Sequence, residues 1–217
     1  MNIIVEGVDK AGKSTFIRML HNDLVNKGIA APTIRHFDKP NLSFSKNHQI
    51  DVQRFDYFWT VENSFSHYTE LSKQVLICDR FHLGEMVYPP LYRGYHVDYQ
   101  HRLENMMPKN TILVLLSAHH NLIKDRFEGE DYLKGNDIRK CIKLFDRAYQ
   151  RSIIPMKVRI YQKWDKHTSS DENQNMASIM TYAAIRDLLP IINHYKTEPF
   201  THTYQVKSSE EIENVRV

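Results

Sequence analysis

The chain has 217 residues, of which 41% are apolar and 25% are charged, and its net charge is +3. This composition is typical of a globular protein, and the positive charge is too weak to indicate nucleic-acid binding by itself. The longest apolar run, residues 112–116, is too short to cross a bilayer, and because a strand-like segment starts at residue 2 we expect no signal peptide. We therefore expect one cytoplasmic domain, residues 1–217, with Cys78 and Cys141 reduced.

Strand-like and helix-like segments alternate from the start of the chain. The apolar residues 2–6 predict a strand, and a helix follows to about residue 27, where Gly28 provides a stop. A second strand is expected at residues 33–37. The polar residues 41–50 then predict a loop.

The middle of the chain predicts a long helix and two buried strands. Asp51 is a candidate cap for a helix that reaches about residue 73. Aromatic and neighbouring residues at three- and four-residue steps should form the core face of this helix: Phe55, Phe58, Glu62, Phe65 and Tyr68. Residues 75–78 and 111–116 are short apolar runs of the kind that parallel sheets bury.

The end of the chain leaves two candidates for the last strand. A charged segment, residues 124–140, leads into an amphipathic helix that contains Phe145 and Tyr149. Residues 156–162 are the favoured last strand, and residues 204–206 are the alternative.

A terminal helix is expected at residues 171–189, with Pro190 just past its end. Residues 191–217 would be a C-terminal extension, either an extra strand or a mobile tail, and residues 166–175 are the best candidate for a flexible linker. The twelve histidines show no metal-binding spacing. Strands and helices in this alternation predict an α/β fold of three layers, with a parallel sheet of about five strands between helices.

A glycine-rich turn joins the first strand to the first helix. It runs Gly7-Val8-Asp9-Lys10-Ala11-Gly12-Lys13-Ser14-Thr15 and satisfies the phosphate-loop pattern G-x-x-x-x-G-K-[ST]. Backbone N–H groups of such a turn converge on one point and attract phosphate oxygens. Lys13 is expected to add positive charge for the β- and γ-phosphates, and the Ser14 hydroxyl is a candidate ligand for Mg²⁺. These nine residues are therefore predicted to bind the phosphates of ATP.

Residues around this loop extend the pattern. Glu6 precedes the loop, Asp9 is its third residue, and Asp79-Arg80-Phe81 follows the third strand. In these motifs the chain resembles thymidylate kinases and, more broadly, nucleoside monophosphate and deoxynucleoside kinases. The resemblance covers about residues 1–150. It implies a phosphate-loop (P-loop) nucleoside monophosphate kinase fold with a lid at about residues 124–140.

The resemblance implies a set of catalytic side chains at the carboxyl edge of the sheet. Lys13 would bind the donor phosphates, Lys10 would reach the transferred phosphoryl group, and the planar guanidinium of Arg80 would grip the acceptor phosphate. Asp9 suits contact with Mg²⁺, a water molecule or an acceptor hydroxyl, but a turn-stabilising aspartate is the alternative. Asp79 suits Mg²⁺ binding, and capping of the following turn is its alternative.

The acceptor is less well defined. The candidates for binding it are Arg35, Arg54, Phe58, Arg80 and Tyr88, and the lid candidates are Arg126, Lys134 and Arg139. The Arg-Glu-Pro-Gly-Gly stretch usual in the family is absent, and residues 58–63 lack the family's nucleotide-facing arginine. Arg54 is a possible substitute, and Phe58 or Trp59 is placed to stack on a pyrimidine, with core packing as the default role of both rings.

The expected reaction is Mg²⁺-dependent phosphoryl transfer from ATP to a deoxynucleoside monophosphate, most simply dTMP to dTDP. One alternative is a hydroxyl kinase for a deoxynucleoside or a modified base in DNA, with Glu6, Asp9 and Glu85 as candidate general bases. A nucleotide-driven switch is a remote alternative, because no N-K-x-D motif is present. The expected partners are small nucleotides, without a membrane. The resemblance is compatible with a homodimer, and nothing in the sequence indicates nucleic acid.

Overall fold

The structure is a computed structural model that describes residues 1–70, 74–127, 135–195 and 204–206. Within these residues a parallel six-stranded sheet has the order β2-β3-β1-β4-β5-β6. Its strands are β1 (Asn2–Gly7), β2 (Ala31–His36), β3 (Gln74–Asp79), β4 (Thr111–Ala118), β5 (Met156–Gln162) and β6 (Tyr204–Val206). The predicted fold class is confirmed, with six strands in place of about five.

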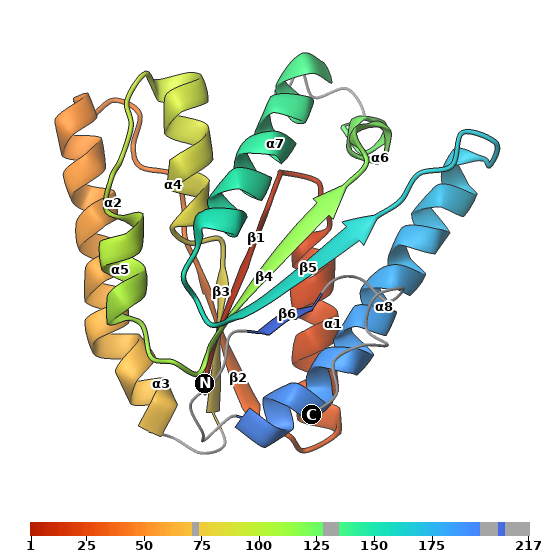
Figure 1. The fold of residues 1–217 in the computed structure, drawn as a ribbon, viewed down its shortest axis with the longest axis horizontal. Helices are drawn as coiled ribbons and strands as arrows, with labels where there is room; N and C mark the ends of the chain where they lie inside the picture. Colours follow the sequence, from red (N-terminus) through yellow and green to blue (C-terminus); the bar gives the residue numbers. More distant parts are fainter. Residues whose placement is uncertain (71–73, 128–134, 196–203, 207–217) are drawn as a thin grey trace.

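Helices connect the strands and cover both faces of the sheet (Figure 1). They are α1 (Lys13–Asn26), α2 (Lys46–Thr60), α3 (Ser66–Glu70), α4 (Leu83–Tyr88), α5 (Gln100–Met106), α6 (His120–Asp125), α7 (Gly135–Arg151) and α8 (Ser170–Tyr195). Two π-helical turns, η1 (Val61–Phe65) and η2 (Pro89–Arg93), continue α2 and α4. The carboxyl ends of β1, β4 and β5 all point toward the top of Figure 1, the edge at which open α/β sheets bind ligands.

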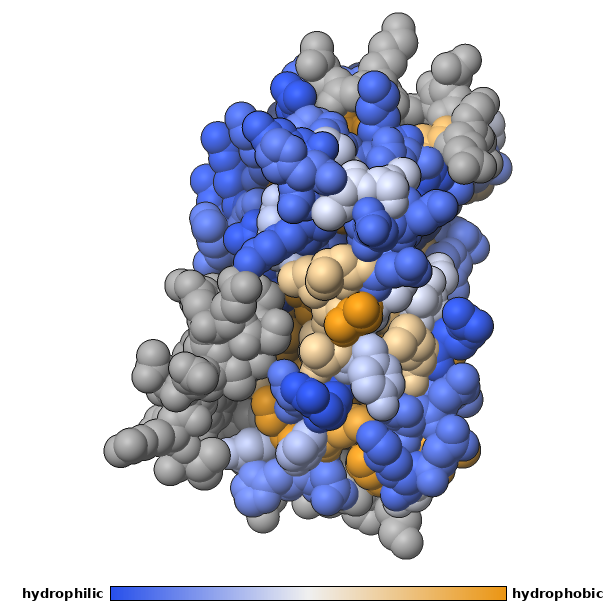
Figure 2. Space-filling model, turned by 90° about the vertical axis from the view of Figure 1, so that its right-hand side faces the viewer, coloured by the Kyte–Doolittle hydropathy of each residue, from blue (hydrophilic) through white to orange (hydrophobic). Residues whose placement is uncertain are grey.

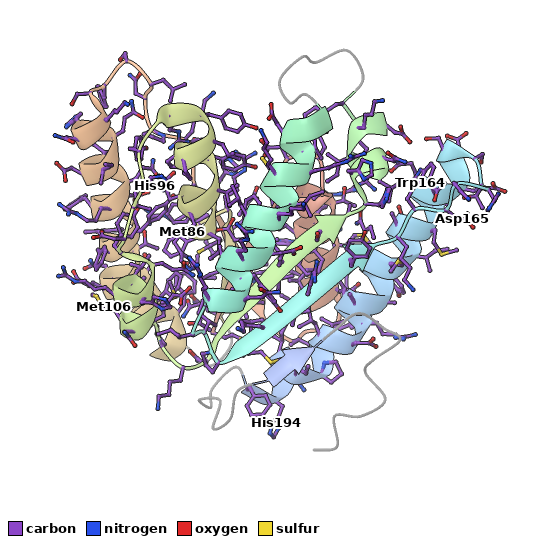
Figure 3. The ribbon with its side chains drawn as sticks, turned by 45° about the horizontal axis from the view of Figure 1, so that its top comes forward. Met86, His96, Met106, Trp164, Asp165 and His194 are labelled. Atoms are coloured by element: carbon purple, nitrogen blue, oxygen red, sulfur yellow. The ribbon has the colours of Figure 1, made fainter. Side chains whose placement is uncertain are left out.

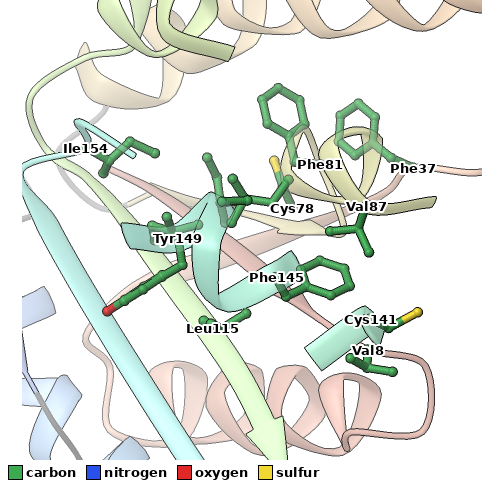
Figure 4. Packing of buried hydrophobic residues seen from close by; sticks show 14 of the residues in the cluster. Val8, Phe37, Cys78, Phe81, Val87, Leu115, Cys141, Phe145, Tyr149 and Ile154 are labelled. Atoms are coloured by element: carbon green, nitrogen blue, oxygen red, sulfur yellow. The ribbon is translucent and has the colours of Figure 1, made fainter. Parts of the chain in front are cut away.

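Two apolar cores hold the three layers together. On one face of the sheet, α1 and α8 enclose a core that includes Phe16. On the other face, α2, α4, α5 and α7 enclose a second core, where Phe81 and Phe145 pack as shown in Figure 4. The phosphate loop contributes Val8 to the second core and Ala11 to the first. Burying a side chain of the size of Val8 stabilises the fold by about 1.5–3 kcal/mol. Because Ala11 is buried on the other face, the loop is anchored from both sides of the sheet.

The helix after β2 begins earlier than predicted. Ser45 caps α2 by accepting a hydrogen bond from the His48 N–H at 3.4 Å, so the helix starts at Lys46 and not after Asp51. Only the first part of residues 41–50 is therefore a loop. Serine and aspartate are both favoured caps, and sequence alone does not decide between them.

The buried face of this helix also differs from the expected aromatic stripe. Phe65 is buried as predicted, but Phe55 is 71% exposed and Tyr57 occupies the core in its place. The buried face of α2 already runs through Gln49, Gln53 and Tyr57 at steps of four, and Val61 and Phe65 of η1 continue it. Because two of these residues are polar, a stripe of aromatic residues does not mark the buried face, and the predicted Glu62 is also exposed.

Both candidates for the last strand form strands. β5 pairs with β4, and β6 pairs with β5 in a register that places Met156 opposite Tyr204. The terminal helix α8 continues to Tyr195, so Pro190 lies inside it and not past its end. Leu189 and Ile192 flank the proline and are buried, and their packing outweighs the backbone hydrogen bond that proline removes.

Residues 166–175 form a hydrogen-bonded turn and the start of α8, where a flexible linker was expected. Asn173 is only 3% exposed, and its Nδ2 donates to the Asp165 carbonyl at 2.9 Å and to Thr168 Oγ1 at 2.8 Å. Its Oδ1 accepts from the Asp165 N–H at 2.7 Å. Trp164 and Asp165 lie beside the first turn of α8 in Figure 3.

Figure 2 looks onto the side of the molecule where α8 lies and shows apolar residues in the middle of a mainly polar surface. Exposed apolar side chains of α8 include Met176, Ile179 and Tyr182. Among the described residues, no helix is long and apolar enough to cross a membrane, and no three His, Cys, Asp or Glu side chains are grouped to bind a metal. Cys78 and Cys141 are buried and form no disulfide.

Candidate active site

The phosphate loop lies where β1 passes into α1. Gly7 has a φ of 144°, and a Cβ atom at this position would clash with the Leu116 carbonyl oxygen of β4, so the close approach of the two strands requires glycine. Gly12 has a φ of 93° and directly precedes α1, while the Ala11 N–H donates to the Val8 carbonyl at 3.1 Å. The first N–H groups of α1 have no partner within the helix, so they are available to an anion at this end.

A first cavity of about 580 Å³ opens beside this loop. Its lining from the loop and α1 comprises Asp9, Lys10, Gly12, Lys13, Ser14 and Thr15. Strand ends contribute His36, Asp79, Arg80 and Gln162, and the remaining lining residues are Arg126, Phe127, Gln174, Ala177, Ser178 and Thr181. The volume is in the usual range for a small-molecule site, and basic side chains outnumber acidic ones, which suits a polyphosphate.

Lys13 is poised for an anion in this cavity. Its Nζ donates to the carbonyl oxygens of Gly7 at 2.8 Å and Val8 at 3.0 Å, and lies 3.8 Å from the Asp9 carboxylate. Burial lowers the pKa of Lys13, and the charge of Asp9 opposes that shift. A phosphate group beside Nζ would favour the protonated form further.

Arg126 follows α6 and connects the start of the predicted lid with the phosphate loop. Its Nη1 donates to the Lys10 carbonyl and to Gln162 Oε1, both at 2.9 Å, and its Nε donates to Gln174 Oε1 at 2.7 Å. Lys10 has a φ of 63°, which is unfavourable for a residue other than glycine. One guanidinium thus stabilises the loop conformation and links it to β5 and α8.

A second cavity of about 640 Å³ lies between the segment after β2 and the end of α4. Its lining residues are Asp9, Lys39, Leu42, Phe44, Ser45, Lys46, Gln49, Arg80, Tyr88, Tyr92 and Arg93. The rings of Tyr88 and Tyr92 are stacked, with centroids 6.3 Å apart and an interplanar angle of 27°. Basic side chains beside aromatic rings suit a ligand in which an anionic group is attached to a flat ring.

Asp9 and Arg80 line both cavities. Arg80 Nη2 donates to Asp9 Oδ1 at 3.1 Å, and both side chains are partly exposed. Arg80 has a φ of 64° directly after β3. The two cavities therefore adjoin at this pair, which is where ligands in the two cavities would approach each other.

Glu6 fixes the turn that presents Arg80. Its Oε1 accepts hydrogen bonds from the backbone N–H groups of Phe81 and Leu83, both at 2.9 Å. Glu6 is almost fully buried, and this burial raises its pKa. The carboxylate is therefore engaged in shaping the site.

Asp79 ends β3 and lines the first cavity together with Ser14. Its Oδ2 lies 2.9 Å from His36 Nδ1, while its Oδ1 is buried without a hydrogen-bond partner. An unpaired buried carboxylate oxygen at a cavity wall indicates a ligand site. The Asp79 carboxylate and the Ser14 hydroxyl are the oxygen ligands that Mg²⁺ prefers, so the residues fit this ion.

Comparison with known proteins agrees with this geometry. The family model described as thymidylate kinase matches residues 5–161, which is more than half of the chain. The chain belongs to the thymidylate kinase family. It is a nucleotide kinase, as the motifs predicted. A curated thymidylate kinase from Neorickettsia sennetsu is 30% identical over 148 residues, which cover 59% of this chain and 72% of that protein.

Solved structures share the fold of this family member at low identity. The YorR protein of Bacillus subtilis, in complex with phosphorylated GDP, is 24% identical with a TM-score of 0.50, over 86% of this chain and 98% of that one. Polyphosphate kinase 2 from Arthrobacter aurescens is 12% identical with a TM-score of 0.53, over 94% of this chain and 72% of that one.

The structure brings the predicted catalytic residues of the kinase together. Asp9, Lys10, Lys13 and Arg80 all line the first cavity. Of the predicted acceptor residues, Arg80 and Tyr88 line the second cavity. Their individual roles stay predictions.

Three predicted acceptor residues of the kinase line neither of these two cavities. Arg35 forms an ion pair with Asp56 at 2.7 Å, and Arg54 forms one with Asp51 at 2.8 Å. Phe58 packs against Tyr99, with ring centroids 6.1 Å apart, and carries the Arg102 guanidinium over its face. An acceptor role for them would require these contacts to rearrange.

The predicted lid is described only in part. Arg126 lines the first cavity, and Arg139 donates to His120 Nε2 at 2.8 Å on the surface. Lys134 lies outside the described residues.

Several cavity residues were missed by the reasoning from sequence. They are Lys39, Leu42, Phe44, Ser45, Lys46, Gln49, Tyr92 and Arg93 in the second cavity, and His36, Phe127, Gln162, Gln174, Ala177, Ser178 and Thr181 in the first. Lys39 and His36 carried a usable signal, because they follow or end a parallel strand at the carboxyl edge of the sheet. The others come together only through the fold.

Proposed function

We propose that this kinase transfers the γ-phosphoryl group of ATP to dTMP and releases ADP and dTDP. The observation that carries the proposal is that two cavities of nucleotide size meet at Asp9 and Arg80. ATP in the first cavity, with its phosphates on the loop, would place the γ-phosphoryl group toward an acceptor phosphate in the second. Catalysis of this transfer depends mainly on positioning and on neutralisation of charge.

The basic residues of the first cavity would position the donor. Lys13 would exchange its bonds to the Gly7 and Val8 carbonyls for phosphate oxygens. Lys10 lines the first cavity, and the bond from Arg126 to its carbonyl holds its peptide in the unusual conformation. The Lys10 side chain would approach the γ-phosphoryl group from this position.

Mg²⁺ is part of the proposal. The Ser14 hydroxyl and the Asp79 carboxylate would hold it, and His36 would keep Asp79 oriented through the contact with Oδ2. When bound, the ion neutralises charge on the donor phosphate oxygens.

The acceptor side favours a phosphate over a hydroxyl. A phosphate oxygen is already ionised at neutral pH, whereas a hydroxyl requires a general base. Of the candidate bases, Glu6 accepts two backbone hydrogen bonds, Glu85 pairs with Arg93 at 3.0 Å, and Asp9 pairs with Arg80. Arg80 would exchange Asp9 for the acceptor phosphate.

The test is a panel of acceptors with γ-labelled ATP and Mg²⁺: dTMP, dUMP, dCMP, dGMP, dAMP, thymidine and duplex DNA. We expect label in the nucleoside diphosphate formed from dTMP. Label in thymidine or DNA without label in dTDP would overturn the proposal, and ATP binding without any transfer would favour a switch. Omission of Mg²⁺ should abolish transfer to dTMP.

Homodimer formation and a cytoplasmic location remain part of this proposal. Val52, Phe55 and Trp59 are exposed at three- and four-residue steps on α2, a stripe that would suit self-association. Light scattering across a concentration series tests it, and a monomer at every concentration would exclude the dimer. The unpaired cysteines agree with a reducing compartment.

A further inference from the structure

The second cavity contains a buried amide whose hydrogen bonding is incomplete. Gln49, in the first turns of α2, is only 6% exposed and lines this cavity. Its Nε2 donates to the Phe44 carbonyl oxygen at 2.7 Å. Because a carbonyl oxygen only accepts, this bond fixes which end of the amide is the donor. The other end, Oε1, is buried without a partner.

A buried acceptor without a donor costs free energy, and such an atom in the wall of a ligand cavity indicates a ligand that supplies the missing N–H or O–H. Gln49 thus gives the cavity one buried acceptor that the protein itself leaves unpaired, in addition to the charged groups of its wall.

Lys46 adds a donor to the same cavity. The two residues are three positions apart on α2, so they occupy one face of the helix, and both line the cavity. Lys46 Nζ donates to the Gly94 carbonyl at 3.1 Å, and an ammonium group has three N–H bonds, so this contact leaves donors for a ligand. The same face of α2 thus offers the cavity both an acceptor and a donor.

This pairing matches a ring N–H that neighbours a carbonyl. Thymine and uracil present such an edge at N3–H, and guanine presents one at N1–H. A cytosine or adenine in the same position would place an unprotonated ring nitrogen, itself an acceptor, against Gln49 Oε1. Two facing acceptors repel each other, and the buried oxygen would stay unpaired.

We infer that Gln49, supported by Lys46, sets the base preference of the acceptor site. It selects nucleotides whose base carries a ring N–H beside a carbonyl, which are those of thymine, uracil and guanine, over those of cytosine and adenine. This inference rests on the proposed function in that the second cavity binds the acceptor, but it does not depend on thymine being the preferred base.

The experiment compares Gln49→Met with Gln53→Met. Methionine keeps the length and volume of glutamine and removes both hydrogen-bonding ends. Gln53 is the matched control, because it lies on the same helix, is also 6% exposed and also donates its Nε2 to a backbone carbonyl, that of Asp38 at 3.2 Å. It lines neither cavity.

The measured quantity is kcat/KM for dTMP, dUMP, dGMP, dCMP and dAMP under saturating ATP. In Gln49→Met we expect kcat/KM for the first three to fall about tenfold, with little change for the other two, so the preference shrinks. Gln53→Met should keep the wild-type ratios. Gln49→Glu keeps an acceptor oxygen and should retain more of the preference than Gln49→Met, which separates base selection from a general loss of packing.

Two results would overturn the inference without contradicting the proposed kinase activity. One is that Gln49→Met keeps the wild-type ratios of kcat/KM among the nucleotides, and the other is that the wild type uses dTMP and dCMP equally well. Use of dGMP but not dTMP would overturn the proposed substrate, and a loss of dGMP preference in Gln49→Met would still support the inference. If no monophosphate accepts a phosphoryl group, both proposals fail.

Discussion

Replacement of Arg126 by methionine separates the stability of the fold from the geometry of the phosphate loop. The change keeps an apolar stem of similar length and removes the guanidinium that donates to Lys10, Gln162 and Gln174. The bond to the Lys10 carbonyl is exposed, so water replaces it readily. The two glutamine oxygens are partly buried and lose a charged donor.

The expected loss of stability is modest. A hydrogen bond to a charged group contributes about 1.5–3 kcal/mol, but solvent access and the cost of burying the guanidinium, seen in the lowered pKa of Arg126, reduce this. We expect a net loss of about 1–2 kcal/mol, equivalent to roughly 3–6 °C in Tm for a protein of this size. The loss of activity should be larger, since a displacement of the loop by about 1 Å costs about 100-fold in rate.

The assay pairs thermal unfolding with initial rates over a range of ATP concentrations. Arg126→Lys should give an intermediate rate, because an ammonium keeps the charge but lacks the fixed fork of the guanidinium. Arg186→Met, an exposed arginine on α8 that contacts only its neighbour Asp187 among the interactions described, is the control for loss of charge. Wild-type kcat and KM for ATP in Arg126→Met would refute the idea that this bond network positions the loop.

Other expected outcomes concern single residues of the loop and of the wall between the cavities. Lys13→Ala should lower kcat by about 100- to 1000-fold and leave the circular dichroism spectrum unchanged, because its side chain is placed for an anion; near-normal turnover would contradict this. Arg80→Ala should reduce transfer to dTMP far more than background ATP hydrolysis, and an equal loss of both in the two assays would indicate a structural role. Gly7→Ala should destabilise the fold by at least about 2 kcal/mol, measured by denaturant unfolding. The alanine Cβ would clash with the Leu116 carbonyl oxygen, and alanine disfavours the φ at this position. Wild-type stability would mean that β1 and β4 can separate.

The parts of the fold that sequence predicted well are those whose signal is local. The apolar runs within β1, β3 and β4 are buried on both sheet faces, so each is recognisable without knowledge of its neighbours. The phosphate loop is likewise encoded in consecutive residues. The start of α2 was not predictable in this way, because Ser45 and Asp51 are equally good caps and the burial of Gln49 in the folded chain favours the earlier one.

The second cavity, which we propose as the acceptor site, shows why most of its residues escaped prediction. It joins Lys46 and Gln49 of α2 with Tyr92 and Arg93 of η2, and their separation along the chain contains no periodic signal. Arg54 was a reasonable candidate by position, but it is exposed and has a carboxylate partner one turn away on its own helix. Which arginine faces a ligand depends on the rotation of the helix, and the polar residues Gln49 and Gln53 on the buried face of α2 hide that rotation in the sequence.

The ion pair between Asp9 and Arg80 forms part of the wall of both cavities, which limits how the enzyme can be altered. A substitution of either residue changes both cavities, so its effects on the binding of the two proposed substrates cannot be separated. Substitutions of both residues should combine non-additively, because the two side chains are in contact. Gln174 lines only the first cavity, which we propose for the donor, and Gln49 lines only the second, which we propose for the acceptor. Evolution or design can therefore retune one substrate at these outer walls while the other keeps its affinity.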